Sequence, residues 1–179
     1  LAVDGLVRSK TRRDEWELGG TLTTTDLEEA AAVESLLAAS LQGRDLPIAW
    51  SHPDSSNVHG FVVSGIRKAA QSQALRLRWD GKPILARRGG SREVEVAGAG
   101  VFKVTEMRAV QGEGRHVAVY FSDELSPEQN LRGLVTLEPG PFTTRIEGNV
   151  LKVFPQKHRV GAATLNVEAA VRNASVGGR

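Results

Sequence analysis

Histidine is the residue of this sequence best suited to bind a metal ion or transfer a proton, and there are four: His52, His59, His116 and His158. No two of them have the spacing that places two ligands on one face of a helix. His52 and His59 flank a loop and are the pair that could approach each other. Zinc, however, usually binds three or four nitrogen or sulfur ligands. We therefore interpret both as exposed loop residues and predict no metal site.

Two arginines form the clearest cationic feature. In residues 75–79 apolar side chains alternate with Arg76 and Arg78, which places both guanidinium groups on one face of a predicted strand. Together with the arginines at 87–88, this face could bind phosphate or an acidic partner. No aromatic residue interleaves on it to stack bases. Arg76 and Arg78 are our candidate partner-binding residues, and a solvated strand face is the alternative.

The glycine-containing stretches do not match nucleotide-binding loops. Residues 112–114 begin like a dinucleotide fingerprint, but such a loop opens a helix, whereas residues 116–120 alternate like a strand. Residues 80–83 lack the glycine spacing and the terminal hydroxyl of a phosphate loop. We predict a hairpin turn at each place and no cofactor.

No arrangement of nucleophilic or acid–base residues is recognisable either. The sequence contains no Gly-x-Ser-x-Gly motif. Asp123, Glu124 and Glu128 surround a predicted helical turn, where acidic side chains interact favourably with the N-terminal end of the helix dipole. We expect no catalytic residue and no enzyme activity. An unrecognised hydrolase is an alternative, which convergence of a Ser-His-Asp set would reveal.

Length and composition indicate two ordinary globular domains. The chain has 179 residues, enough for two domains of about 90 residues each. Hydrophobic residues make up 40% and aromatic residues 5%, which predicts cores built mainly from Val, Leu, Ile and Ala. Lys and Arg number 23 against 21 Asp and Glu, so the net charge of +2 does not indicate a nucleic-acid partner.

The sequence also limits the chemistry of these residues and their relation to a membrane. It contains no cysteine, which excludes disulfides, thiolate metal sites and a cysteine nucleophile within this stretch. No window approaches about 18 consecutive apolar residues, so we expect no membrane span. The chain begins at Leu1 without a targeting segment, and we interpret it as a fragment of a longer secreted protein.

The small residues 97–100 mark the predicted domain boundary, giving domains over 1–97 and 98–179. Both halves contain a similar order of expected elements, as divergent copies of one β-sandwich unit would. In the first half an alternating strand over 92–96 precedes the boundary. We expect that the second domain lacks its last strand within this sequence.

In the first domain we predict strands over 46–50, 58–63 and 75–79, and a surface helix over 26–42. Thr25 and Glu28 form a capping-box pattern in front of this helix, and Gly43 follows it. The apolar stripe that we expect to pack on the sheet consists of Ala30, Val33, Leu37 and Leu41.

In the second domain we predict strands over 117–121, 133–137, 145–147 and 150–154. The last two are joined by Gly148-Asn149, a pair suited to the positive φ of a tight hairpin. Between the first two strands, Ser126-Pro127-Glu128-Gln129 has the pattern of a capped helical turn, with Ser126 as the N-cap and Gln129 as the reciprocal cap.

These stretches resemble a known family. FSDELSPEQNLRGLVTLE and EGNVLKVFP, together with GTLTTTDLEEAAAVESLLAASLQGRDLPIAW and ALRLRWDGKPI, are similar to the N-terminal macroglobulin-like domains of bacterial α2-macroglobulins. The resemblance implies tandem all-β sandwiches of the macroglobulin-like, fibronectin-III or immunoglobulin type, the first with an inserted α-helix. It also implies a periplasmic location, with a membrane anchor through an upstream lipoprotein segment.

In that family a protease is caught after it cuts a bait segment in a later domain, and many members carry a Cys-x-Glu-Gln thioester. Neither feature occurs in this sequence. The resemblance therefore implies a non-catalytic structural or interaction module within a protease-trapping assembly. Its implied partners are the other domains of the parent protein, target proteases through the later domains, and an envelope protein such as a penicillin-binding protein.

A β-sandwich adhesin or carbohydrate-binding module is the alternative function, because repeated sandwiches serve binding as readily as structural support. Aromatic platforms for sugars would come from Trp16, Trp50 or Trp79, which we otherwise interpret as core residues. Exposure of one of these indoles on a concave face would favour the alternative.

Overall fold

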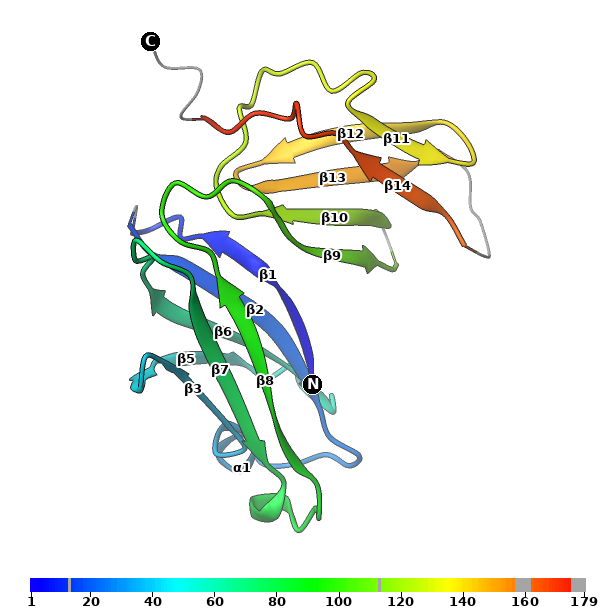
Figure 1. Ribbon diagram of the computed structural model, residues 1–179. Coiled ribbons are helices and arrows are strands. Elements are labelled where there is room, and N and C mark those ends of the chain that lie inside the picture. Colours follow the sequence, from blue (N-terminus) through cyan, green and yellow to red (C-terminus); the bar gives the residue numbers. More distant parts are fainter. Residues whose placement is uncertain (13, 113, 157–161, 175–179) are drawn as a thin grey trace. The chain divides into compact units, whose positions relative to one another are not determined.

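The computed structural model describes residues 1–179 except 13, 113, 157–161 and 175–179 (Figure 1). His158, one of the four histidines, lies outside the described residues. The chain divides into two compact units, Leu1–Val101 and Phe102–Arg179. The boundary predicted between residues 97 and 98 falls in the small-residue stretch just before this division. No helix among the described residues is long and apolar enough to cross a membrane.

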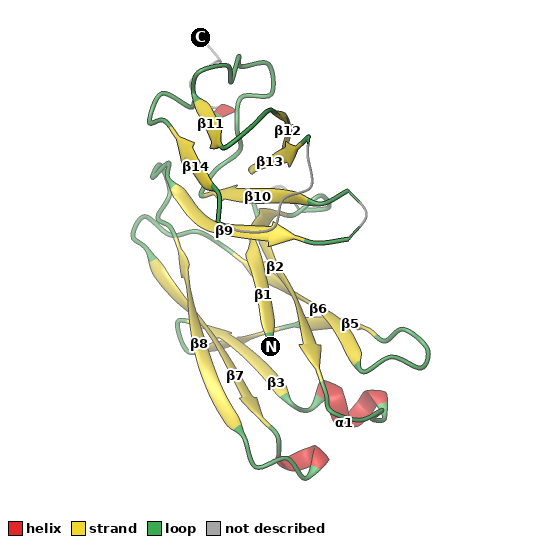
Figure 2. Ribbon diagram, turned by 90° about the vertical axis from the view of Figure 1, so that its right-hand side faces the viewer, coloured by secondary structure: helices red, strands yellow, loops and turns green. Residues whose placement is uncertain are grey.

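The first unit is a sandwich of two antiparallel four-stranded sheets (Figure 2). One sheet has the order β1-β2-β6-β5, with strands Ala2–Arg8, Trp16–Thr23, Val58–Ile66 and Ile48–Ser51. The other has the order β4-β3-β7-β8, with strands Arg44–Leu46, Leu37–Leu41, Gln73–Asp80 and Gly89–Val96. These orders correspond to the ABED and C′CFG sheets of immunoglobulin-type sandwiches. The predicted all-β sandwich class is therefore confirmed.

Aliphatic side chains fill the space between the two sheets of the first unit. Alternation along each strand buries every second side chain, as in β7, where Leu75 and Leu77 are fully buried and their neighbours are exposed. Leu18 and Val63 meet them from the opposite sheet in the same hydrophobic core. This composition agrees with the expectation of cores with few aromatic residues.

The helix predicted over 26–42 is wrong in its extent. The structure has only a short helix, α1, over Ala30–Glu34, and Leu37–Leu41 forms strand β3. Residues 37 and 41 fit the expected helical stripe, but the apolar residues at 37, 39 and 41 fit a period of two, and on the strand they are the buried ones. β3 lies between β7 and β4 and pairs with β7 along its full length. This pairing favours the strand over the helix.

The predicted helix signals are used differently in the structure. Glu29 is the N-cap of α1 and makes no side-chain capping bond, so the capping box at Thr25 and Glu28 does not form. Gly43, expected to end a helix, instead makes a tight turn between β3 and β4 together with Gln42, at φ values of 75° and 53°. A turn with two left-handed residues suits the twist of a two-residue hairpin.

The strand predicted over 46–50 is divided by Pro47. Leu46 ends β4 in one sheet and Ile48 begins β5 in the other, so the chain passes between the sheets at the proline. Proline has no N–H to donate to a ladder, which makes it suitable at this crossing. Its carbonyl accepts a hydrogen bond of 3.1 Å from the N–H of Ser64.

The second unit repeats this strand order. β9 (Val104–Val110), β10 (His116–Phe121), β13 (Val150–Pro155) and β12 (Phe142–Glu147) form one antiparallel sheet. Their order, β12-β13-β10-β9, corresponds to that of β5-β6-β2-β1 in the first unit. The second sheet contains β11 (Val135–Glu138) and β14 (Thr164–Val167), the counterparts of β3 and β7. Among the described residues of this unit, neither β4 nor β8 has a counterpart.

The smaller second sheet leaves the core of its unit less covered. Leu165 and Val167 on β14 are half-buried and contact the cluster around the fully buried Leu151 and Val153. The equivalent apolar side chains of β7, between β3 and β8, are fully buried. Within the described part of the chain, β14 pairs only with β11, which accounts for the difference.

The hairpin predicted at Gly148-Asn149 is confirmed. Glu147 and Val150 are paired at the ends of β12 and β13, and Gly148 has a φ of 59°. Asn149 is buried, and its Nδ2 donates a hydrogen bond of 2.9 Å to the carbonyl of Phe121. The N–H of Phe121 donates in return to the carbonyl of Asn149 at 2.9 Å. The turn is thereby fixed to the end of β10.

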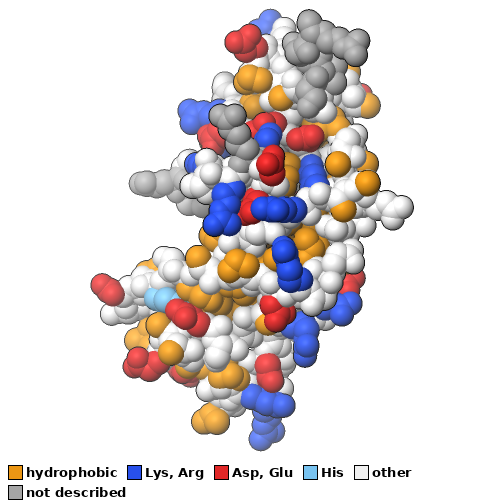
Figure 3. Space-filling model, turned by 90° about the vertical axis from the view of Figure 1, so that its left-hand side faces the viewer, with side chains coloured by type: hydrophobic (Ala, Val, Ile, Leu, Met, Phe, Trp, Pro, Cys, Tyr) orange, Lys and Arg blue, Asp and Glu red, His pale blue; other side chains and the backbone are white. Residues whose placement is uncertain are grey.

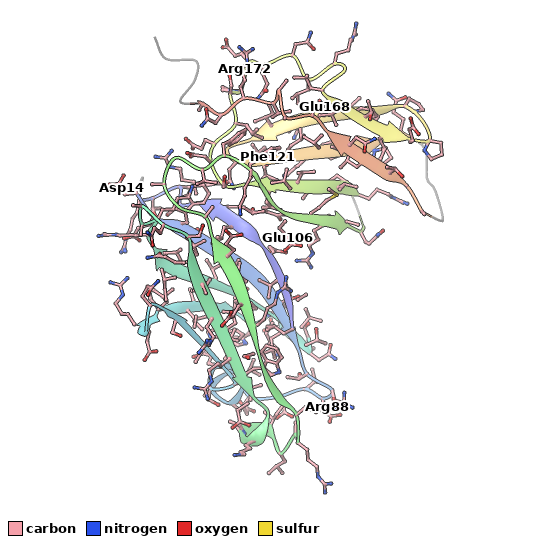
Figure 4. The ribbon with its side chains drawn as sticks, viewed as in Figure 1. Asp14, Arg88, Glu106, Phe121, Glu168 and Arg172 are labelled. Atoms are coloured by element: carbon pink, nitrogen blue, oxygen red, sulfur yellow. The ribbon has the colours of Figure 1, made fainter. Side chains whose placement is uncertain are left out.

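The capped helical turn predicted at 126–129 does not form. Residues 127–128 make a turn without a helix. The Gln129 side chain instead binds Arg172: Nε2 donates to the Arg172 carbonyl at 2.9 Å, and Oε1 accepts from the Arg172 N–H at 2.9 Å. Figure 4 labels Arg172 on the segment that follows β14. Gln129 Nε2 also donates to the Ser126 carbonyl at 3.0 Å, whereas the Ser126 N–H, which a reciprocal cap would bind, donates to the Arg172 carbonyl at 3.0 Å. The glutamine therefore connects its own turn to a segment distant in sequence.

Candidate functional site

The predicted partner-binding arginines lie on the outer face of β7. Both Arg76 and Arg78 are exposed, as the alternation predicts. Arg76 is opposite Glu93 on β8, and its Nη2 and Nε donate to Glu93 Oε1 at 2.7 and 3.2 Å. Arg78 is opposite Ser91. The local carboxylate offsets much of the charge of Arg76, so Arg78 contributes more of the positive potential of this face. A binding role for either arginine stays a prediction.

His52 and His59, which are close in sequence, are brought into direct contact. Their Nδ1 atoms are 3.0 Å apart, and His52 Nε2 is 3.2 Å from Glu34 Oε1 on α1. Since the carboxylate can only accept, neutral His52 carries its proton on Nε2. His59 Nδ1–H then donates to the bare Nδ1 of His52. The three side chains form a hydrogen-bonded chain from the surface into the sandwich.

His59 is not the exposed loop residue that we predicted. It lies on β6, pairs with Leu22 of β2 and is 2% exposed, because its position alternates in phase with the buried residues of that strand. Its Nε2 is buried without a hydrogen-bond partner. Burial lowers the pKa of His59 from the ordinary value of 6.5, and the charge of His52 lowers it further.

The chemistry open to the histidine pair is proton transfer. Among the described residues, neither ring forms a hydrogen bond with a serine or threonine hydroxyl. The two rings form side-chain hydrogen bonds only with each other and with Glu34. No group of three His, Cys, Asp or Glu side chains suited to a metal ion occurs in the described part of the chain. His116 lies apart in the second unit, where its Nδ1 is 2.7 Å from the Gly114 carbonyl.

A pocket of about 350 Å³ lies beside this pair, between β5 and the strands β3 and β4. The indole of Trp50 lines it, together with the carboxylates of Glu34 and Asp45. Trp50 stacks on the His52 ring with a centroid distance of 5.8 Å and an interplanar angle of 14°. Figure 3 shows apolar side chains lying between acidic ones on this face of the first unit. An indole beside carboxylates can bind a polar ligand with an apolar face, such as a sugar.

A second pocket of about 610 Å³ lies at the end of the first unit, between the end of β2 and the connection from β7 to β8. Leu22, Leu36 and Trp79 supply apolar lining, and Arg87 and Arg88 supply positive charge. The connection includes a single 3-10 turn, η1, over Lys82–Ile84. The structure thus separates Arg87 and Arg88 from the β7 face on which we had grouped them by sequence.

The three tryptophans have different surroundings. Trp16 is buried in the first core, with Lys68 Nζ 4.1 Å from its ring centroid. Trp79 is half-buried against Gly90, where a Cβ would lie 2.5 Å from the indole. Trp50 lines the pocket that also contains Glu34 and Asp45, whereas Trp79 lines the second pocket, which also contains Asp80. Sequence reasoning missed Glu34 and Asp45, since their approach to Trp50 depends on how the two sheets face each other.

These features define a protein of two repeated β-sandwich units with candidate sites on the first. No protein-family model matches this sequence, and no curated protein or solved structure matches it either.

Proposed function

We propose that this chain is a non-catalytic structural and interaction module from the N-terminal region of a bacterial α2-macroglobulin-like protein, where it contributes to a periplasmic protease-trapping assembly. The observation that carries the proposal is the repeat of one strand order: β9-β10-β13-β12 with β11-β14 corresponds to β1-β2-β6-β5 with β3-β7. A protein built from serial macroglobulin-like domains would contain such consecutive copies. The resemblance of four sequence stretches to that family supports the same proposal.

Within this proposal the chain contacts the other domains of its parent, whose later domains capture the protease. An envelope protein such as a penicillin-binding protein is the external partner. The β7 face bearing Arg76 and Arg78 is the surface that would meet it, because both guanidinium groups are exposed. Complementary charges of this kind raise association rates and make binding sensitive to salt.

Binding to the periplasmic region of a bifunctional penicillin-binding protein, measured by biolayer interferometry at low and high salt, tests the proposal. We expect salt-sensitive binding that Arg78→Glu weakens more than Arg76→Glu, since Arg76 already pairs with Glu93. Arg145→Glu on β12, also an exposed arginine, makes the same change of charge in the second unit and serves as the control. Absence of binding at low salt, or turnover of peptide or ester substrates by the purified chain, would reject the proposal.

One observation favours the alternative of a carbohydrate-binding module: Trp50 shares its pocket with Glu34 and Asp45. In this case soluble glycans should change the tryptophan fluorescence of the chain, and Trp50→Ala should abolish the change. Trp79→Ala, which removes an indole outside this pocket, is the control. A glycan response that survives Trp50→Ala would exclude this pocket as the site.

A further inference from the structure

The connection between β7 and β8 carries an apolar run that is partly exposed. Residues 83–86 read Pro-Ile-Leu-Ala, and they lie between Lys82 on one side and Arg87-Arg88 on the other. The Leu85 side chain is 94% exposed. A run of four apolar residues at the end of a hairpin is unfavourable in water unless it contacts something else. The connection projects from the end of the first unit (Figure 2).

The backbone holds this connection in one shape. Ile84 and Ala86 donate their N–H groups to the Gly81 carbonyl at 3.1 and 2.9 Å, and Leu85 donates to the Lys82 carbonyl at 2.9 Å. Leu85 has a φ of 57°, a left-handed conformation that a leucine rarely adopts. Unfavourable backbone conformations that the surrounding structure maintains are concentrated at functional sites.

This shape sends adjacent apolar side chains in different directions. Ile84 is half-buried and packs against the core of the first unit, whereas Leu85 projects into solvent. Ile84 therefore attaches the connection to the sandwich, and Leu85 is available for contact. A side chain presented by a preformed loop loses little conformational entropy when it binds.

Positive charge surrounds Leu85. Residues 80–88 contain three cations, Lys82, Arg87 and Arg88, and one anion, Asp80, which gives a net charge of 3 − 1 = +2. Lys82 Nζ is 3.8 Å from Asp80 Oδ2, while Arg87 and Arg88 are exposed. One projecting apolar side chain beside exposed cations is complementary to an anionic bilayer, whose headgroups attract the cations and whose interface accepts the leucine.

We propose that this connection, residues 82–88, docks the first unit on an anionic lipid bilayer, with Leu85 entering the headgroup region. The inference goes beyond the proposed scaffold function and does not depend on it. The acidic residues Asp26, Glu28 and Glu29 lead into α1, which contacts η1, so this end of the unit also carries negative charge. Lipid contact is therefore confined to the connection itself.

Co-sedimentation with vesicles tests the proposal, using phosphatidylcholine alone or mixed with phosphatidylglycerol. We expect binding to the anionic vesicles only, weakened by salt. Leu85→Ser should lower the partition coefficient about tenfold, and Arg87→Gln with Arg88→Gln about thirtyfold. The matched control is Arg76→Gln with Arg78→Gln, which removes the same charge from the β7 face. Glu28→Gln with Glu29→Gln should strengthen binding.

A labelled variant provides a second measurement that does not rely on loss of binding. The sequence contains no cysteine, so Leu85→Cys carries a single environment-sensitive fluorophore. Its emission should shift to the blue on anionic vesicles, and that of Leu27→Cys, a leucine 66% exposed before α1, should not. Failure of the parent chain to sediment, equal losses in the β7 control, or equal shifts at both labels would overturn the proposal.

Discussion

His52 Nδ1 and His59 Nδ1 are 3.0 Å apart, one ring half-buried after β5 and the other buried on β6. The contact requires one nitrogen to donate and the other to accept. Protonation of His59 would put a hydrogen on its buried Nε2, which has no hydrogen-bond partner. This opposes the native arrangement.

The free energy of unfolding should therefore fall as the pH falls through the range of histidine titration. The pKa of His59 in the folded chain is below 6.5, so under mild acid the unfolded chain binds this proton and the folded chain does not. The contribution of His59 to the free energy of unfolding is complete above pH 6.5. It decreases as the pH falls from 6.5 to the pKa of His59 in the folded chain. Urea denaturation between about pH 8 and about pH 5 measures the loss.

Variants separate this effect from other titrations. His59→Leu should flatten the dependence, while His116→Gln in the second unit should leave it unchanged. A hydrogen bond from Arg67 lowers the pKa of Glu15, and one from Lys152 lowers that of Glu147, both from 4.5. These two carboxylates therefore stabilise the folded chain above pH 4.5, and this stabilisation is lost only at lower pH. An unaltered dependence in His59→Leu would assign the acid sensitivity to another group.

Adjacent alanines test whether residues 37–41 form a strand. On β3, Ala39 is 2% exposed and Ala38 points outward. Ala39→Asp should lower the free energy of unfolding by about 3 kcal/mol or more, because it buries a carboxylate without a partner. Ala38→Asp should have little effect. Urea denaturation measures the free energy of unfolding of both variants. Similar losses of this free energy at the two positions would contradict the strand.

Leu37→Asp should also be strongly destabilising, but as a substitution in a buried strand position instead of a helix–sheet contact. Leu37 is 6% exposed and pairs with Trp79. We expect a lower melting temperature by circular dichroism, because the carboxylate would lie in the core between the sheets. A melting curve like that of the unsubstituted chain would show that this side chain does not reach the core.

Gln129 should stabilise the second unit more than Ser126. Removing the amide in Gln129→Ala breaks its bonds to both main-chain groups of Arg172, which we expect to cost about 2 kcal/mol. Ser126→Ala retains the main-chain bond from Ser126 to Arg172 and should change little. Chemical denaturation of the two variants compares them. A larger loss for Ser126→Ala would support the capped turn that the sequence pattern suggested.

The side chain of Asn149, and not only its backbone in the turn, should stabilise the second unit. Its Nδ2 bonds the Phe121 carbonyl inside the second unit, so Asn149→Ala leaves a buried acceptor and should cost about 2 kcal/mol. Asn166→Ala, an exposed position on β14, is the control. Equal stability of the two variants would show that water replaces the lost bond.

Local patterns in the sequence determined several strands and one turn, but β1, β2 and β14 were not predicted. The alternation in residues 75–79 predicted β7 and the outward direction of Arg76 and Arg78, because side chains of any strand point alternately to its two faces. Gly148-Asn149 predicted the hairpin between β12 and β13, since a positive φ there is a local requirement. Cores rich in aliphatic residues followed from composition.

Tertiary structure decided the places where local preference allowed two outcomes. Residues 37–41 suit a helix by composition, and pairing of β3 with β7 and β4 made them a strand, because ladder hydrogen bonds and core contacts outweigh weak intrinsic preferences. The candidate sites arose in the same way. His52 lies beside His59 because β5 and β6 pair at Ser51 and Gly60. Trp50 and Asp45 line one pocket although they belong to different sheets, because the chain passes between the sheets at Pro47.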